Sequence, residues 1–151
     1  MPWPFKARAT PEPCFPVGPY RIDTTIDGLE GLTPLSPAEL VALNVMQFEG
    51  GQIWHAPEAA FMDLKWDTML GTVHGAIYKI SIQWTGPRHQ AGKTYRELAI
   101  YCTKHYRNSA KSMALWDASD GNIILDITNI GAESILNAFV TSEKVRQFRR
   151  L

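Results

Sequence analysis

A strict alternation of apolar and polar residues between positions 78 and 84 constrains the fold more than any other feature. The stretch reads YKISIQW, with Lys79, Ser81 and Gln83 between the apolar positions. Successive side chains of a β-strand point to opposite faces, so this pattern predicts a strand with one buried face. Sheets of that kind are commonly antiparallel. The predicted buried set is Tyr78, Ile80, Ile82 and Trp84.

Further strand patterns surround this one, and turn residues separate them. Glycines at 71 and 75 predict a hairpin turn within residues 61–84, and Asp120-Gly121 and Gly131 predict two more turns. Gly50-Gly51 predicts a turn between two short strands within residues 45–56. The other predicted strands cover residues 20–26, 111–117, 122–128 and 133–141.

Three segments carry helix signals. Ser36, Pro37 and Glu39 form a capping box with proline at the first helical position, which predicts a helix within 35–43. Ser142 predicts the cap of a short C-terminal helix. The principal helix is predicted over 94–107, capped by Thr94 and Glu97. Its apolar stripe is Tyr95, Leu98, Ala99, Cys102 and Tyr106.

The order of these elements predicts an α+β fold, a mainly antiparallel sheet packed on one face by the principal helix. Residues 1–19 hold six of the ten prolines and predict an extended N-terminal arm, which could dock on its own domain or on a second subunit. A chain of this length predicts one domain, over 20–151. Trp66, Trp84 and Trp116 are expected in its core.

Composition narrows the cellular setting. The N-terminus lacks the apolar stretch of a secretory signal, and no window resembles a membrane span. We therefore expect a cytoplasmic protein without membrane contact. Cys14 and Cys102 are too few for a disulfide scaffold; a bridge between them is one alternative, and two reduced thiols is the simpler one.

The charges are unevenly distributed although their sum is zero. Residues 22–64 contain seven acids and no lysine or arginine, whereas residues 79–111 contain seven bases and only Glu97 as an acid. Two explanations are open: a partner of opposite charge, or neutralisation of one segment by the other within the fold, which we favour. The near-neutral pI disfavours nucleic-acid binding. Zero net charge favours self-association.

Residues 83–97, QWTGPRHQAGKTYRE, nearly spell the phosphate-binding loop GxxxxGK[ST]. Pro87 stands where the first glycine is required, and proline removes a backbone donor from the anion cradle. Asp126 follows a predicted hairpin, so its strand is expected to be antiparallel to its predecessor, unlike that of a nucleotide hydrolase. We therefore expect a connector here, with phosphate or carboxylate binding by Arg88, His89, Lys93 and Thr94 as the functional alternative.

Other chemistry finds little support. The four histidines show no metal-ligand spacing, so no metal and no cofactor are expected. Cys102 and His105 are neighbours on the predicted helix, but Cys102 lies on its apolar stripe, where a thiol is usually inert. No serine lies in a nucleophile-elbow pattern. Whether the chain is an enzyme stays open, and we expect that it is not.

The expected function is therefore a non-catalytic module that binds another protein or itself, such as an inhibitor, immunity factor or adaptor. Trp3 and Trp54 are the candidate aromatic anchors, with His55 next to Trp54 and Glu49 just before the predicted Gly50-Gly51 turn. The alternative is a small-molecule or anion-binding protein, or an enzyme, that uses the predicted loop before the 94–107 helix.

Overall fold

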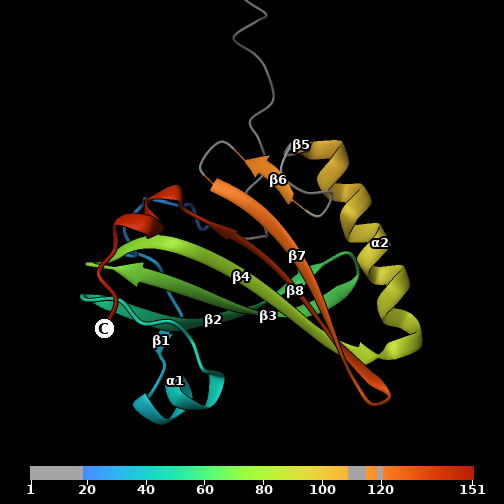
Figure 1. Ribbon diagram of the computed structural model, residues 1–151, viewed down its shortest axis with the longest axis horizontal. Helices are drawn as coiled ribbons and strands as arrows, with labels where there is room; N and C mark the ends of the chain where they lie inside the picture. The colour runs from blue at the N-terminus through green and yellow to red at the C-terminus, as the bar shows by residue number, and fades with distance from the viewer. Residues whose placement is uncertain (1–18, 109–114, 119–120) are drawn as a thin grey trace, which may run out of the picture.

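The computed structural model describes residues 19–108, 115–118 and 121–151. They form an α+β structure with one antiparallel eight-stranded sheet, in the order β1-β2-β3-β4-β8-β7-β6-β5 (Figure 1). The predicted N-terminal arm, Trp3 and Cys14 lie outside these residues. The strands are β1 (Thr33–Pro34), β2 (Gly51–Phe61), β3 (Leu64–Val73), β4 (Ala76–Pro87), β5 (Arg107–Asn108), β6 (Leu115–Ala118), β7 (Gly121–Ile130) and β8 (Glu133–Thr141); the helices are α1 (Pro37–Leu43), α2 (Arg88–His105) and the 3-10 helix η2 (Glu143–Gln147).

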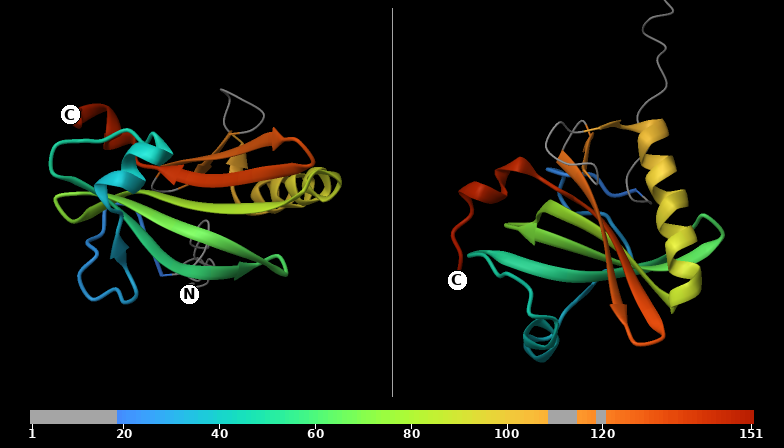
Figure 2. Two further views of the ribbon diagram at one scale, coloured as in Figure 1. Left: turned by 90° about the horizontal axis from the view of Figure 1, so that it is seen from below. Right: turned by 45° about the vertical axis from the view of Figure 1, so that its right-hand side comes forward.

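The long helix α2 packs on one face of this twisted sheet (Figures 1 and 2). Its buried residues Leu98 and Cys102 join alternate residues of the central strands in the main core. The predicted one-sided packing by a principal helix is thus confirmed. Trp66, Trp84 and Trp116 are all buried there, as the sequence predicts.

Several local predictions are confirmed as well. Ser36 and Glu39 form both hydrogen bonds of the capping box at the start of α1. The β3–β4 hairpin turns at His74-Gly75 and the β7–β8 hairpin turns at Gly131, where both glycines have positive φ. Ser142 caps η2, which is a 3-10 helix. The Asp120 side of the remaining predicted turn lies outside the described residues.

The predicted strand over residues 20–26 is wrong. Only Thr25 forms a bridge, with Ala76, although Tyr20 and Ile22 are buried in the main core. Strand β4 pairs with β8 only from Lys79 onward, so the edge of its first residues is open to this segment, and the backbone N–H of Asp23 donates to the carbonyl of Ile77 there. Because Asp23 has a positive φ, the segment is not extended throughout: it makes one short contact with the start of β4 and buries its apolar side chains in the main core.

The predicted strand pair around Gly50-Gly51 is only half present. Residues from Gly51 onward form β2, but on the other side only Phe48 forms a bridge, to Arg150. Backbone hydrogen bonds from Glu49 to Arg149 and from Leu151 to Gln47 complete this contact. The partner of residues 47–49 is therefore the C-terminal segment, which the local sequence does not reveal.

Tyr78 does not share the face of Ile80, Ile82 and Trp84, so this part of the predicted alternation is wrong. The register shifts between Gly71 and Thr72, which pair with Lys79 and Ile77 respectively. Tyr78 is thus the extra residue of a β-bulge, and a bulge re-aims the side chain it carries.

The re-aimed Tyr78 ring belongs to a second apolar cluster with Phe48 and Val73, against which Val145 and Phe148 pack. The rings of Phe48, Tyr78 and Phe148 lie 5.3–5.5 Å apart, centroid to centroid, in edge-on contacts. Such aromatic pairs contribute about 0.5–1.5 kcal/mol each beyond their buried area. This cluster holds residues 44–50 and the C-terminal segment against the end of the sheet that lies opposite α2 in Figure 1.

Candidate functional site

The predicted connector before the principal helix does not exist in the expected form. Strand β4 continues to Pro87, which pairs with Glu133, and helix α2 begins at the next residue, Arg88. Residues 88–93 are therefore helical, and the predicted helix start at Thr94 is wrong. The Thr94 hydroxyl donates to the carbonyl of Gln90 within the helix, 3.2 Å away, so Thr94 does not form the predicted cap.

The predicted anion-binding residues are thus spread over the first turns of α2. Arg88, His89 and Lys93 are exposed and Thr94 is buried. The Arg88 guanidinium donates to the carbonyl of Gly131 at 3.3 Å. Strand β7, which carries Asp126, is antiparallel to β6, as the sequence predicts and unlike the corresponding strand of a nucleotide hydrolase. Anion binding by these four residues stays a prediction.

Residues predicted at an interface lie on and beside β2. The Trp54 side chain is half-buried against the main core, and its indole N–H donates to the Thr72 hydroxyl at 3.0 Å. Glu49 and His55 are exposed. Their predicted role stays untested, and Trp3 lies outside the described residues.

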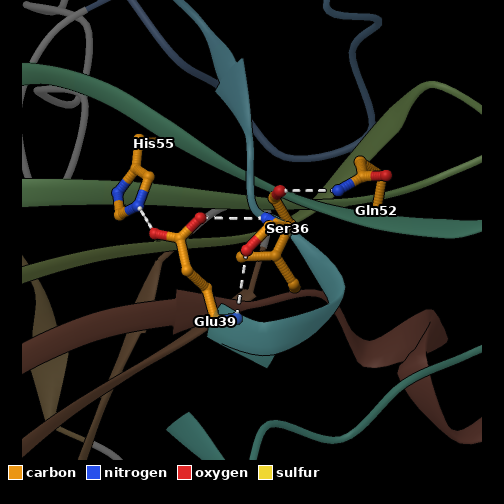
Figure 3. A network of polar contacts seen from close by, with 5 residues as sticks. Ser36, Glu39, Gln52 and His55 are labelled. Atoms are coloured by element: carbon orange, nitrogen blue, oxygen red, sulfur yellow. Dashed lines mark hydrogen bonds and ion pairs between the residues drawn. The ribbon is translucent and has the colours of Figure 1, made fainter. Parts of the chain in front are cut away.

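His55 connects strand β2 to helix α1 through Glu39 (Figure 3). Its Nε2 lies 3.0 Å from Glu39 Oε2, while Glu39 Oε1 accepts from the Ser36 backbone N–H at 2.9 Å. The backbone hydrogen bond and the His55 contact lower the pKa of the Glu39 carboxyl, in that order of effect. The pair holds α1 over the outer face of the sheet, which is the face opposite α2.

Replacing His55 with alanine is expected to raise the pKa of Glu39, because a partner of the ionised carboxylate is removed. The same contact affects stability. A carboxyl whose pKa is lower in the folded than in the unfolded state stabilises the fold above its unfolded pKa, and this contribution is lost as pH falls through its folded pKa. A carboxyl-carbon NMR titration of Glu39 in both proteins checks the pKa change. An unchanged titration would contradict the contact.

Beyond α1, residues 44–46 form one wall of a cleft on the outer face of the sheet. The cavity has a volume of about 440 Å³. Side chains from the segment after α1, from the sheet and from η2 surround it. Its lining residues are Asn44, Val45, Met46, Phe48, Ile53, Met69, Leu70, Gly71, Tyr78, Lys79, Ser81 and Val145.

Sheet register explains how these residues meet. Ile53 on β2 pairs with Gly71 on β3, and Gly71 pairs with Lys79 on β4. In the next row, Met69 pairs with Ser81. Gly71 is required here because an added Cβ would lie 2.7 Å from the Tyr78 ring. The bulge and this glycine together let Tyr78 pack beside the cleft.

Lys79 is the one charged residue among those that line the cleft. Burial lowers the pKa of its amine, because removal from water disfavours the ammonium form. Its Nζ lies 4.6 Å from the centre of the Phe139 ring, a cation–π distance. In the described part of the chain, no carboxylate lies within ion-pair distance of this amine.

Sequence reasoning placed Lys79 and Ser81 correctly on the face away from Ile80, but did not identify a site there. The alternation gives the face of each residue, whereas the cleft depends on residues 44–46 and Val145, which approach from outside the sheet. No local signal marks these as neighbours of Lys79. The packing of Tyr78 on Gly71 could not be predicted either, because the alternation of apolar and polar residues does not reveal the bulge.

Cys102 is fully buried in the main core, as expected for a packing residue, and burial raises the pKa of its thiol to about 12.

Neutralisation of the acidic segment, residues 22–64, by the basic segment, residues 79–111, is not seen as ion pairs in the described part of the chain. Over the described ranges, no lysine or arginine of residues 79–108 forms an ion pair with an acid of residues 22–64.

No protein-family model, curated protein or solved structure matches the chain. Within the described residues, no helix is both long and apolar enough to cross a lipid bilayer.

Proposed function

We propose that the protein binds a small, largely apolar organic molecule in the cleft on the outer face of the sheet. The cavity volume of about 440 Å³ carries this proposal. Small-molecule sites are concave, have volumes of roughly 300–1,000 Å³ and combine an apolar lining with a few polar groups. Met46, Ile53 and Met69 supply apolar surface here, and Lys79 and Ser81 supply polar groups.

Binding without catalysis fits this lining best. A nucleophilic hydroxyl needs a base within hydrogen-bond reach. Ser81 and Lys79 share the cleft, but no hydrogen bond joins their side chains in the described structure. The two methionines instead suit an adaptable apolar surface, because the thioether side chain is unbranched and flexible.

Methyl NMR of methionine tests the proposed site directly. Titration with the neutral fluorophore N-phenyl-1-naphthylamine is expected to shift the methyl signals of Met46 and Met69, which line the cleft. Met62 is the internal control, because it packs against the main core on the other face. Saturable one-to-one binding with these two shifts supports the proposal. Absence of binding, or shifts at Met62 alone, would refute it.

A second candidate is the protein-binding module expected from the sequence. The supporting observation is a group of exposed apolar side chains on α1 and just after it: Val41, Leu43 and Met46 are 76%, 49% and 51% exposed. Apolar groups gathered on a surface are typical of interaction sites. Concentrating the protein alone would then shift the Met46 methyl signal without that of Met69, whereas a cleft ligand shifts both.

A further inference from the structure

The chemistry around Lys79 specifies the cleft ligand more closely. Its cross-strand neighbours Gly71 and Thr141 are uncharged, and the Phe139 ring lies under its amine. A π-face attracts a cation but does not neutralise it. The ammonium thus lies in a partly dry site with an aromatic contact and without a counter-ion among the described residues.

A partly desolvated charge is costly unless it is paired. Lys144, the lysine of η2, is already bound to Asp23 at 3.6 Å, and Lys79 has no such partner. Because no acidic residue lines the cleft, an anion entering it meets attraction from Lys79 without repulsion from the wall.

We propose that the ligand is a small amphipathic carboxylate, whose charged group pairs with Lys79 and whose apolar body contacts Met46, Ile53 and Met69. This inference rests on the proposed function, since it requires a ligand in the cleft. A carboxylate fits better than a phosphate ester. The lining offers one compact cation and no arginine, whereas doubly charged phosphates are usually held by several donors or by an arginine fork.

Octanoate and octan-1-ol form a matched pair of probes, because they share an eight-carbon chain and differ in the charged group. Octanoate is expected to bind about 10- to 100-fold more tightly, the factor that corresponds to a hydrogen bond with a charged group. Affinities are measured by the methionine methyl shifts of Met46 and Met69. Both signals should move with either probe.

Variants assign the charge preference to one residue. Lys79→Met keeps an unbranched side chain of similar length and removes the amine, so it should lower octanoate affinity by about 10- to 100-fold and leave that of octanol unchanged. Lys79→Arg keeps the charge and should retain the preference for octanoate. Lys104→Met is the matched control, because Lys104 is exposed on α2 and does not line the cleft, and Lys93→Met tests the other predicted anion site.

Each result has a defined meaning. Equal affinities for octanoate and octanol in the wild-type protein overturn the carboxylate inference but leave the cleft as a binding site. If Lys93→Met loses octanoate binding and Lys79→Met does not, the carboxylate binds at the start of α2. That result also overturns the inference that the carboxylate pairs with Lys79. If neither probe, nor the neutral fluorophore, shifts Met46 and Met69, the proposed function fails too. If Lys79→Met does not fold, the affinities of octanoate and octan-1-ol for the wild-type protein and for Lys79→Arg still decide whether the cleft prefers a carboxylate.

Discussion

Leu98→Ala is expected to lower the free energy of unfolding by about 2–5 kcal/mol, among the largest effects of any single substitution in this chain. The Leu98 side chain is fully buried between α2 and the sheet, in the main core. Truncation removes apolar area from that contact and leaves a cavity, because the surrounding strands cannot close around it. Urea unfolding followed by circular dichroism measures the change.

Ile100→Ala is the matched control on the same helix. Its side chain is 65% exposed, so little buried area is lost, and alanine has the higher helix propensity. We expect its free energy of unfolding to stay within about 0.5 kcal/mol of wild type. Equal losses in the two variants would mean that the Leu98 face of α2 does not pack on the sheet.

Alkaline pH is the second condition expected to have a large effect: stability should fall as pH rises from about 9 to about 12. Burial raises the pKa of Cys102 from 9.0 to about 12 and that of Tyr78 from 10.0 to about 12. A group with a raised folded pKa stabilises the fold below its unfolded pKa and loses this contribution as pH rises through the folded value. For the fully buried Cys102 the loss is about 2–4 kcal/mol.

Cys102→Ala and Tyr78→Phe identify the groups responsible. Each removes one titrating group, so the plot of unfolding free energy against pH should be less steep between 9 and 12 than in the wild type. Lys79 acts in the opposite direction, because its lowered pKa makes stability rise with pH up to 10.5. It is present in both variants, so the comparison of slopes cancels its effect. Slopes identical to wild type would contradict the burial of both groups.

Local sequence rules correctly predicted the elements whose causes lie within a few residues. The capping box at Ser36 and Glu39 is satisfied by its own helix, and the glycines at 75 and 131 supply the positive φ of two hairpin turns. Cys102 and Leu98 on the stripe of the principal helix are buried as the spacing predicts. In each case the deciding interaction is local.

The predictions that failed depended on partners distant in the sequence. Thr94 resembles a cap, but the pairing of Pro87 with Glu133 extends β4 and lets α2 begin at Arg88. Residues 20–26 have a strand-like pattern, but β8 covers β4 from Lys79 onward and leaves only the first residues of β4 for a short bridge with Thr25. Residues 47–49 pair with the C-terminal residues, about one hundred positions further along the chain.

The sequence by itself determined the α+β class, the sheet face that builds the main core and the opposite face on which Lys79 lies, because strand and helix periodicities assign a face to each residue. Only the tertiary structure decided that this face carries a cleft. The bulge at Tyr78, the wall from residues 44–46 and the approach of Val145 create the cleft together. Periodicity fixes the direction of a side chain, whereas a cavity depends on long-range packing of segments that no local pattern connects.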